Sequence, residues 1–403
     1  MHEHEMGAWA RGSLGTLLAA ALLSTAAEAT EIKPLWRADL DDSLQGRIYQ
    51  TLVLPGTPPR VVATTPDQVV AFEAGKASSL FRLERDGSRG RSAVLPTALL
   101  DDAQALPLIG LLVHDHHAVA AFELSDLAGN VLVKVDDARN FYYRLAPDGT
   151  SFVGIDAGTT HAALTADSVK YRFFDREGKP VKREPVSRNP AQRTDSAYTP
   201  DGELFLINSI AAGLAAYDPD SGGQQWAAGP AAHHFAASNA PVGLVLADVL
   251  GKPGVVTLIS QGKPVWALSL EQLGIQEPVR DLAMSPNGRH LVVATRSALL
   301  LMSPNDDKPL AVVPAKPGAA INSITVGDTG VVLVGMQDED LRGGEVWFLD
   351  AANGQPVADV IKTRHARSNA WIPMVQLDAG GKRALVRTLE RLELYSIDAG
   401  TGR

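Results

Sequence analysis

One short sequence unit recurs along this chain and constrains its fold more than any other feature. In its clearest copy, Gly344–Val357, an apolar run ends at Asp350, Gly354 follows, and Pro356-Val357 opens a second apolar run. An Asp side chain accepts backbone N–H groups within a turn, and glycine adopts the positive φ that tight turns need. The unit therefore predicts two antiparallel strands joined by a turn.

Two turn types alternate along the chain. Further copies of the first unit lie at 72–76, 174–181, 217–226, 259–266 and 302–310. The second type, Pro-Asp-Gly or an equivalent, precedes strong apolar runs and lies at 147–149, 200–202, 286–288, 328–330 and 378–380. Successive turns of this second type are often about 40 to 50 residues apart, the spacing of four-stranded propeller blades.

These repeats predict an all-β fold, a β-propeller of four-stranded antiparallel blades. The candidate blades are residues 48–85, 106–137, 142–184, 196–229, 240–270, 280–313, 321–361 and 371–403. We therefore expect eight blades, with seven as the alternative if one of the first two units is an insertion. Only one short helical turn, at 270–274, is expected. The polar connections 86–105 and 184–195 are candidate functional loops.

The two ends of the chain complement each other. The last unit ends at Ser396–Arg403 with a third strand and a turn but no fourth strand. Lys33–Leu40 has the pattern of the fourth strand at Lys263–Leu268. We expect the N-terminal segment to supply the missing strand and to close the ring, which hides two sheet edges.

The first 29 residues have the features of a secretory signal peptide. Arg11 precedes the apolar run Leu14–Leu23, and Ala27-Glu28-Ala29 is a small-x-small cleavage site. The run is too short to cross a bilayer. We expect cleavage after Ala29, a single propeller domain over residues 30–403, and a periplasmic or secreted location.

Composition excludes several function classes. Removing residues 1–29 takes away three acids and one arginine, so the net charge changes from −9 to −7. An acidic chain without concentrated Lys and Arg is not expected to bind nucleic acid or anionic membranes. The chain has no cysteine, so it has no thiolate metal site, no cysteine nucleophile and no lipid-anchoring cysteine.

On these turns, the chain resembles the pyrroloquinoline-quinone-like repeat propellers. The likeness lies in Asp350–Gly354, in Asp398–Gly402 and in Ala216-Tyr217-Asp218 with Trp226. The Pro-Asp-Gly turns are also similar to those of WD-type propellers. The resemblance covers nearly the whole mature chain and implies the fold, because the shared residues are turn and packing residues.

The same family includes quinone-dependent dehydrogenases and a periplasmic lipoprotein that assists outer-membrane assembly. The enzymes use an adjacent cysteine pair, a calcium or lanthanide site and an Asp base, whereas the lipoprotein is anchored by a cysteine. This chain has neither cysteine feature. The resemblance is therefore limited to the scaffold, and we assign no cofactor.

Several side-chain groups are candidate metal ligands. His114, His116 and His117 surround a predicted hairpin tip, and imidazole suits zinc, copper or nickel. The carboxylates of Asp338, Glu339 and Asp340 suit calcium. The alternative interpretation of both groups is a solvated loop, which we favour. The remaining histidines considered are His233 and His234, expected in a linker, and His161 and His290, expected in structural roles.

No spacing indicates a catalytic triad, a nucleophile elbow or a phosphate loop, so no catalytic, cofactor-binding or metal-binding residue is assigned. We expect an exported, non-enzymatic propeller, a monomer or part of a hetero-complex, that binds another periplasmic or envelope protein or a ligand. Two alternatives stay open: a propeller hydrolase or lactonase with a channel metal, and the propeller subunit of a periplasmic dehydrogenase complex.

Overall fold

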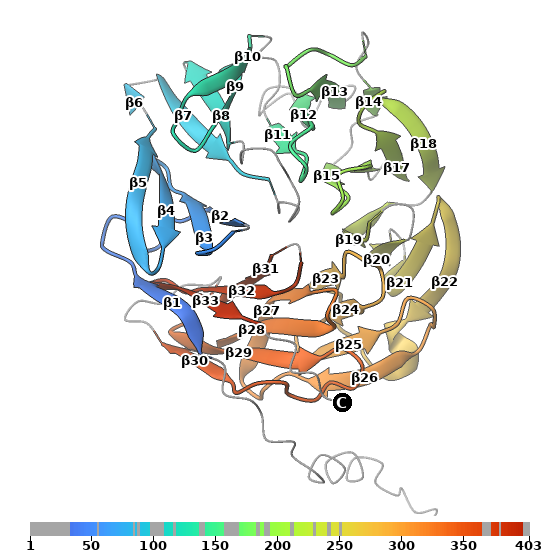
Figure 1. Ribbon diagram of the computed structural model, residues 1–403. Helices are drawn as coiled ribbons and strands as arrows, with labels where there is room; N and C mark the ends of the chain where they lie inside the picture. The colour runs from blue at the N-terminus through green and yellow to red at the C-terminus, as the bar shows by residue number, and fades with distance from the viewer. Residues whose placement is uncertain are drawn as a thin grey trace, which may run out of the picture.

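The computed structural model confirms an all-β propeller. It describes residues 33–54, 56–83, 85–86, 89–96, 109–115, 118–136, 142–156, 169–182, 186–188, 194–209, 213–228, 231–239, 243–249, 252–364, 372–378 and 380–397. The strands in these ranges form eight antiparallel sheets, seven with four strands and one with five. The sheets follow one another around a central axis in chain order (Figure 1).

The first half of the ring contains four sheets. Their strands are β2 (Gln50–Leu54), β3 (Arg60–Thr64), β4 (Gln68–Glu73) and β5 (Lys76–Arg82); β6 (Arg85–Asp86), β7 (Arg89–Val94), β8 (Ile109–Asp115), β9 (Ala118–Ser125) and β10 (Val131–Val135); β11 (Tyr142–Leu145), β12 (Ser151–Asp156), β13 (Val169–Asp175) and β14 (Val186–Arg188); and β15 (Thr194–Tyr198), β16 (Phe205–Ser209), β17 (Gly213–Asp218) and β18 (Gly223–Ala228).

The second half contains the other four. Their strands are β19 (Ala232–Ala237), β20 (Leu244–Val249), β21 (Lys252–Ser260) and β22 (Lys263–Ser269); β23 (Asp281–Met284), β24 (Leu291–Ala294), β25 (Ala298–Met302) and β26 (Pro309–Pro314); β27 (Ala319–Val326), β28 (Val331–Asp338), β29 (Gly343–Asp350) and β30 (Ile361–Arg364); and β31 (Met374–Leu377), β32 (Arg383–Arg387) and β33 (Arg391–Ser396) with β1 (Pro34–Asp39). The expected helical turn is the 3-10 helix η3 (Leu270–Leu273).

The irregular sheet coincides with the irregular second unit of the sequence. Its five strands run in the order β10-β9-β8-β7-β6, and β6 and β7 lie within or beside the segment 86–105 that we expected to be a loop. The expected loop 184–195 likewise contains β14 and the start of β15. Short polar strands lack the apolar runs by which strands are recognised, which explains both errors.

Two strand assignments of the repeat unit need correction. In the clearest copy, Pro356 forms only an isolated bridge with Leu349, and the fourth strand β30 begins at Ile361. The blade expected to begin at residue 240 begins at Ala232, where β19 starts. Both boundaries lie in short polar or alanine-rich segments that carry little strand signal.

The expected closure by the N-terminal segment is confirmed. β1 pairs antiparallel with β33, with Trp36 opposite Leu394 and Ala38 opposite Leu392. Trp36 and Ala38 are buried, and the Trp36 ring stacks on Phe72 of the next blade with a centroid distance of 6.4 Å. β1 thus joins the first and last blades of the ring through both hydrogen bonds and apolar packing.

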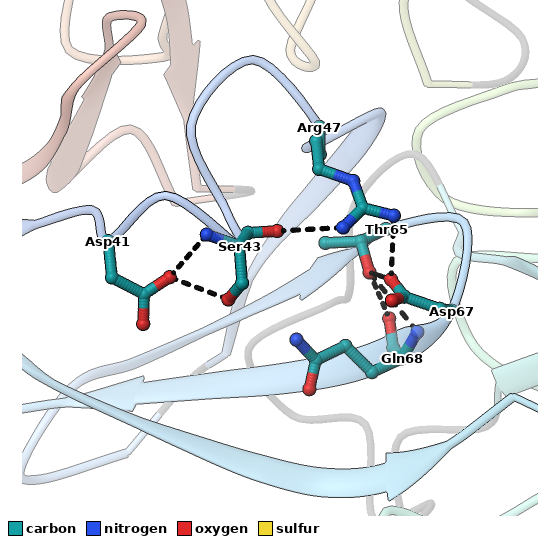
Figure 2. Close-up of polar contacts among 6 residues, drawn as sticks. All are labelled: Asp41, Ser43, Arg47, Thr65, Asp67 and Gln68. Atoms are coloured by element: carbon teal, nitrogen blue, oxygen red, sulfur yellow. Dashed lines mark hydrogen bonds and ion pairs between the residues drawn. The ribbon is translucent and has the colours of Figure 1, made fainter.

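The connection from β1 to β2 is fixed on the first blade by polar contacts (Figure 2). Arg47 lies 3.3 Å from Asp67 in an ion pair and donates to the carbonyl of Ser43 at 3.4 Å. Asp67 in turn accepts the hydroxyl proton of Thr65 at 2.9 Å. These contacts hold the closing strand to the turn between β3 and β4.

The core lies between neighbouring sheets rather than in one central cluster. Middle strands are buried on both faces, so they read as continuous apolar runs; all four residues of β24, Leu291–Ala294, are buried. Outer strands alternate, as in β26, where Leu310 and Val312 are exposed while their neighbours are less so. Adjacent sheets therefore stabilise each other by burying the faces of their middle strands.

The glycine of the repeated turn between the third and fourth strands packs against the outer strand of the preceding blade. Gly354 has φ +73°, and a Cβ there would lie 2.6 Å from Val313 of β26. Gly75 has φ +80°, and its Cβ would lie 2.4 Å from the carbonyl oxygen of Arg37 in β1. Gly178 and Gly262 make equivalent contacts with Val133 and Trp226. Only glycine permits both the φ and the approach.

We predict that Gly354→Ala destabilises the protein more than Gly274→Ala. Both residues have positive φ, +73° and +76°, but Gly274 has no atom within 4 Å of the added Cβ. Gly274→Ala should therefore show the conformational cost alone, about 1 kcal/mol. Gly354→Ala should cost about 1–3 kcal/mol more because of the clash with Val313. Urea denaturation measures both; equal losses would contradict the proposed interblade contact.

We also predict that Trp36→Ala weakens the closure of the ring while Leu35→Ala does not. The two side chains are neighbours on β1, but Trp36 is 7% exposed and Leu35 is 49% exposed. Trp36→Ala should lower the free energy of unfolding by about 3 kcal/mol, whereas Leu35→Ala should change it by less than about 0.5 kcal/mol.

A variant lacking residues 30–41 should melt at a lower temperature than Trp36→Ala. Unchanged melting of that variant would refute a closing role for β1.

Candidate functional site

A hollow opens at the end of the central channel where the first and second strands of each blade are joined. Its volume is about 610 Å³, and its described lining comes mainly from the inner strands β15, β19, β23, β27 and β31 and the turns that follow them. These inner strands surround the middle of the ring in Figure 1. We call this hollow the channel mouth.

Small side chains on three successive inner strands make room for the channel mouth. Ala197 on β15, Ala236 on β19 and Ala283 on β23 all line it. They occupy the same level of their blades. In each blade, the alanine pairs with the second strand one residue pair away from the pair that borders the turn. At this level β27 carries Thr325, β31 carries Gln376 and β11 carries Arg144. The two longer side chains bond across blades: Gln376 accepts from Thr51, and Arg144 donates to the Ser196 carbonyl.

The charged groups of the channel mouth are acidic. Its lining includes Asp195, Asp328 and Asp378, and the described lining residues contain no Lys, Arg or His. Asp195 accepts the Ser196 N–H at 2.8 Å through Oδ1, and Asp328 accepts the Asn287 N–H at 2.8 Å through Oδ1. A low-dielectric hollow with one sign of charge concentrates counter-ions of the opposite sign.

A groove between two blades adjoins the channel mouth. It also has a volume of about 610 Å³ and lies between the β15–β18 and β19–β22 sheets. Thr199, Ala237 and Asn239 line both the channel mouth and the groove. Farther out, the groove is lined by Trp226 and Lys263. We call it the interblade groove.

Asn239 lies at the junction of the two hollows, and its side-chain oxygen is buried without a hydrogen-bond donor among the described residues. Its backbone N–H donates to the Pro286 carbonyl at 2.7 Å, which ties two blades together. Its side-chain Oδ1 is buried and accepts no hydrogen bond from the described part of the chain. A buried acceptor without a partner costs free energy, so this amide gains from any donor that reaches it.

Two further polar groups of the inner strands have perturbed acidity. Burial raises the pKa of Asp281 to about 6. Hydrogen bonds from the N–H groups of Leu282 and, across the blade boundary, Ile324 lower this pKa, but burial has the larger effect. Burial also raises the pKa of Tyr198, whose hydroxyl lies 3.2 Å from that of Ser151. Since the raised pKa of Asp281 reflects the cost of burying its charge, ionisation near neutral pH destabilises this blade contact.

The predicted histidine cluster is only partly within the described structure. His114 is the penultimate residue of β8 in the expected hairpin with β9, and its Nε2 lies 2.8 Å from the Ser92 hydroxyl. His116, His117 and His161 lie outside the described residues. The structure therefore gives His114 a hydrogen-bonding role between β7 and β8.

The other histidines occupy strands or strand ends. His233 and His234, expected in a linker, lie on the inner strand β19. That expectation was wrong because alanines on either side weaken the strand pattern. His290 follows a Pro-Asn-Gly turn, and burial lowers the pKa of its imidazole. Its backbone N–H donates to Ser285 at 3.0 Å, which agrees with a structural role.

The acidic run at the end of β28 contacts a lysine. Lys316 donates to Asp338 at 3.3 Å and to Glu345 at 2.9 Å. Asp340 accepts the Arg342 N–H at 2.9 Å within the turn. Among the residues whose placement is described, no group of three or more His, Asp or Glu side chains has a metal-binding arrangement. Nor does any described helix have the length and apolar composition to cross a membrane.

The acidic residues of the inner strands were not predicted as site residues, although two of them share a sequence pattern. Asp195 and Asp281 both occur in the pattern Asp-x-Ala-x-Ser/Thr-Pro-Asp/Asn-Gly, at 195–202 and 281–288. Both aspartates lie five positions before the Pro of the turn, on the inner strand and at the same level. Extending the turn repeat backward along the chain would have placed both carboxylates beside the channel.

Comparisons with known proteins support the fold alone. No protein-family model matches the chain, and no curated protein matches its sequence. Similar solved structures include the C-terminal WD40 domain of Sif2, with 12% identity, a TM-score of 0.61, and coverage of 92% of this chain and 99% of that one. Another is Sqt1 of Saccharomyces cerevisiae, with 9% identity, a TM-score of 0.58, and coverage of 91% and 100%. The chain is thus a β-propeller similar to WD40 domains, and membership of the quinone-like repeat family is not confirmed.

Proposed function

We propose that this chain is an exported, non-enzymatic propeller that binds another protein through the face carrying the channel mouth. The observation that carries the proposal is the junction of two hollows of about 610 Å³ each, on one face, through Thr199, Ala237 and Asn239. Concave surfaces with apolar walls and a few polar groups are the usual places where partners bind. The similarity to WD40 domains supports a scaffold of this kind.

The partner in this proposal is another periplasmic or envelope protein. Export rests on the sequence: Arg11, the apolar run Leu14–Leu23 and the cleavage site ending at Ala29. We include in this proposal the resemblance of the repeated turns to quinone-like repeats, which concerns the scaffold and implies no cofactor. The net charge of −7 expected for the mature chain favours partners without acidic surfaces.

The export proposal predicts the mass of the mature protein. Protein recovered from the envelope fraction of its native cells should begin at Thr30, because cleavage after Ala29 removes the leader. Intact-mass measurement with N-terminal sequencing tests this. Recovery of the chain with residues 1–29 still attached would refute it.

The binding proposal predicts that filling the channel mouth abolishes partner capture. Ala197→Phe places a large ring in the mouth, at a position that belongs to none of the buried apolar clusters of the described residues. Leu310→Phe is the matched control because Leu310 is 50% exposed on the outer strand β26. Purified wild type and both variants are compared by chemical crosslinking in envelope extract, followed by mass spectrometry.

The supporting result is a protein crosslinked to wild type and to L310F but at least tenfold less to A197F. Melting curves of the three proteins establish that A197F is folded. A partner captured equally by A197F and lost with L310F would move the binding site to the outer rim and overturn the proposal.

A further inference from the structure

Two carboxylates of the channel mouth, those of Asp195 and Asp328, each have one oxygen that is not engaged by the described residues. Asp195 is exposed and Asp328 is partly exposed. Each uses Oδ1 to accept one backbone N–H, and the Oδ2 of each makes no hydrogen bond or ion pair with the described residues. Asp378 adds a third carboxylate, whose Oδ1 accepts the N–H groups of Lys382 and Arg383. With no described cation in the lining, the mouth is complementary to a positive group.

Part of the wall around these carboxylates is apolar, which favours a cation with an aliphatic part over a small, fully hydrated one. Ala197, Ala283, Met284 and Val326 all line the mouth. Lys and Arg side chains combine an aliphatic stem with a charged end, so they suit a hollow with apolar walls and acids at its rim. Water excluded from such walls strengthens the attraction between the charges.

The shape of the site points to an extended chain. The interblade groove continues from the mouth through Asn239 and reaches the Trp226 side chain, which is partly exposed. Asn239 lines both hollows at their junction, where a side-chain amide is a suitable partner for a backbone group of a bound chain. An indole is a large apolar surface for a neighbouring side chain.

We propose that the channel mouth and the interblade groove together bind a basic peptide segment of the partner protein. A Lys or Arg side chain of the segment enters the mouth beside Asp195 and Asp328, and an adjacent apolar residue lies on Trp226. This inference rests on the proposed function and names the chemistry of its partner. Nucleic acid is disfavoured because the same carboxylates repel phosphates.

The test uses full-length mature protein and two labelled hexapeptides, one alternating Lys with Leu and one alternating Glu with Leu. Fluorescence anisotropy at about 0.15 M salt should show binding of the Lys peptide only, since surface attraction over more than about 8 Å is screened there. The double variant Asp195→Asn, Asp328→Asn should bind the Lys peptide at least about tenfold more weakly. An Asn side chain still offers Oδ1 to the Ser196 and Asn287 N–H groups, so the fold contacts are retained.

Asp340→Asn is the matched control. Asp340 is exposed, its Oδ1 also accepts one backbone N–H, and it lies in the turn between β28 and β29, at the opposite end of the strands from the channel mouth. Its substitution should leave affinity unchanged. An equal loss in D340N, or equal binding of the Lys and Glu peptides, would show non-specific attraction or apolar binding and would overturn the proposal.

Two further measurements separate a peptide from a small amine. Trp226→Phe should weaken the Lys peptide severalfold without changing the affinity of lysine amide, because only the peptide reaches the groove. Equal effects on both probes, or no effect on the peptide, would overturn the part of the proposal that concerns the groove. If A197F loses the crosslinked partner while the Lys peptide fails to bind, the basic-peptide inference falls and the proposed binding face stands.

Discussion

The contact between a turn glycine and the outer strand of the preceding blade is the constraint on which this propeller depends. At Gly354 and Gly75 the backbone approaches the preceding blade closely. A Cβ would lie 2.6 Å from Val313 at Gly354 and 2.4 Å from the Arg37 carbonyl oxygen at Gly75. Sheets can then stack with their middle strands buried on both faces. Since the chain has no cysteine, it has no disulfide bonds, and burial of apolar surface between sheets supplies the stability.

The closing strand obeys the same constraint. β1 supplies the fourth strand of the last sheet, and Gly75 of the first blade packs on the backbone of Arg37, at the place where other turn glycines pack on the outer strand of the preceding blade. Arg383 and Arg387 of β32 add hydrogen bonds to the carbonyls of Leu54 and Ile48 in the first part of the chain. Ring closure therefore combines an edge-strand ladder, a glycine contact and guanidinium hydrogen bonds, so its loss should affect the whole ring.

The candidate site follows from a local departure from the tight packing of the ring. Three successive inner strands carry alanine at one level, where β11 and β31 carry Arg144 and Gln376, longer side chains that bond across blades. The space that results is bordered by Asp195 and Asp328 and continues past Asn239 toward Trp226. Asp328 lies in the turn between β27 and β28 and also accepts the Asn287 N–H of the preceding blade, so the geometry of the site is coupled to the scaffold.

The sequence alone determined the repeat, the all-β class, the closing role of Lys33–Leu40 and the single helical turn, because turns and apolar runs are local signals. It misplaced the strands within 86–105 and 184–195 and the segment holding His233 and His234, where short polar or alanine-rich strands carry weak signals. Only the tertiary structure decided the channel mouth. Residues such as Asp195 and Asp328 are more than one hundred positions apart in the chain, and only the ring brings them to one hollow.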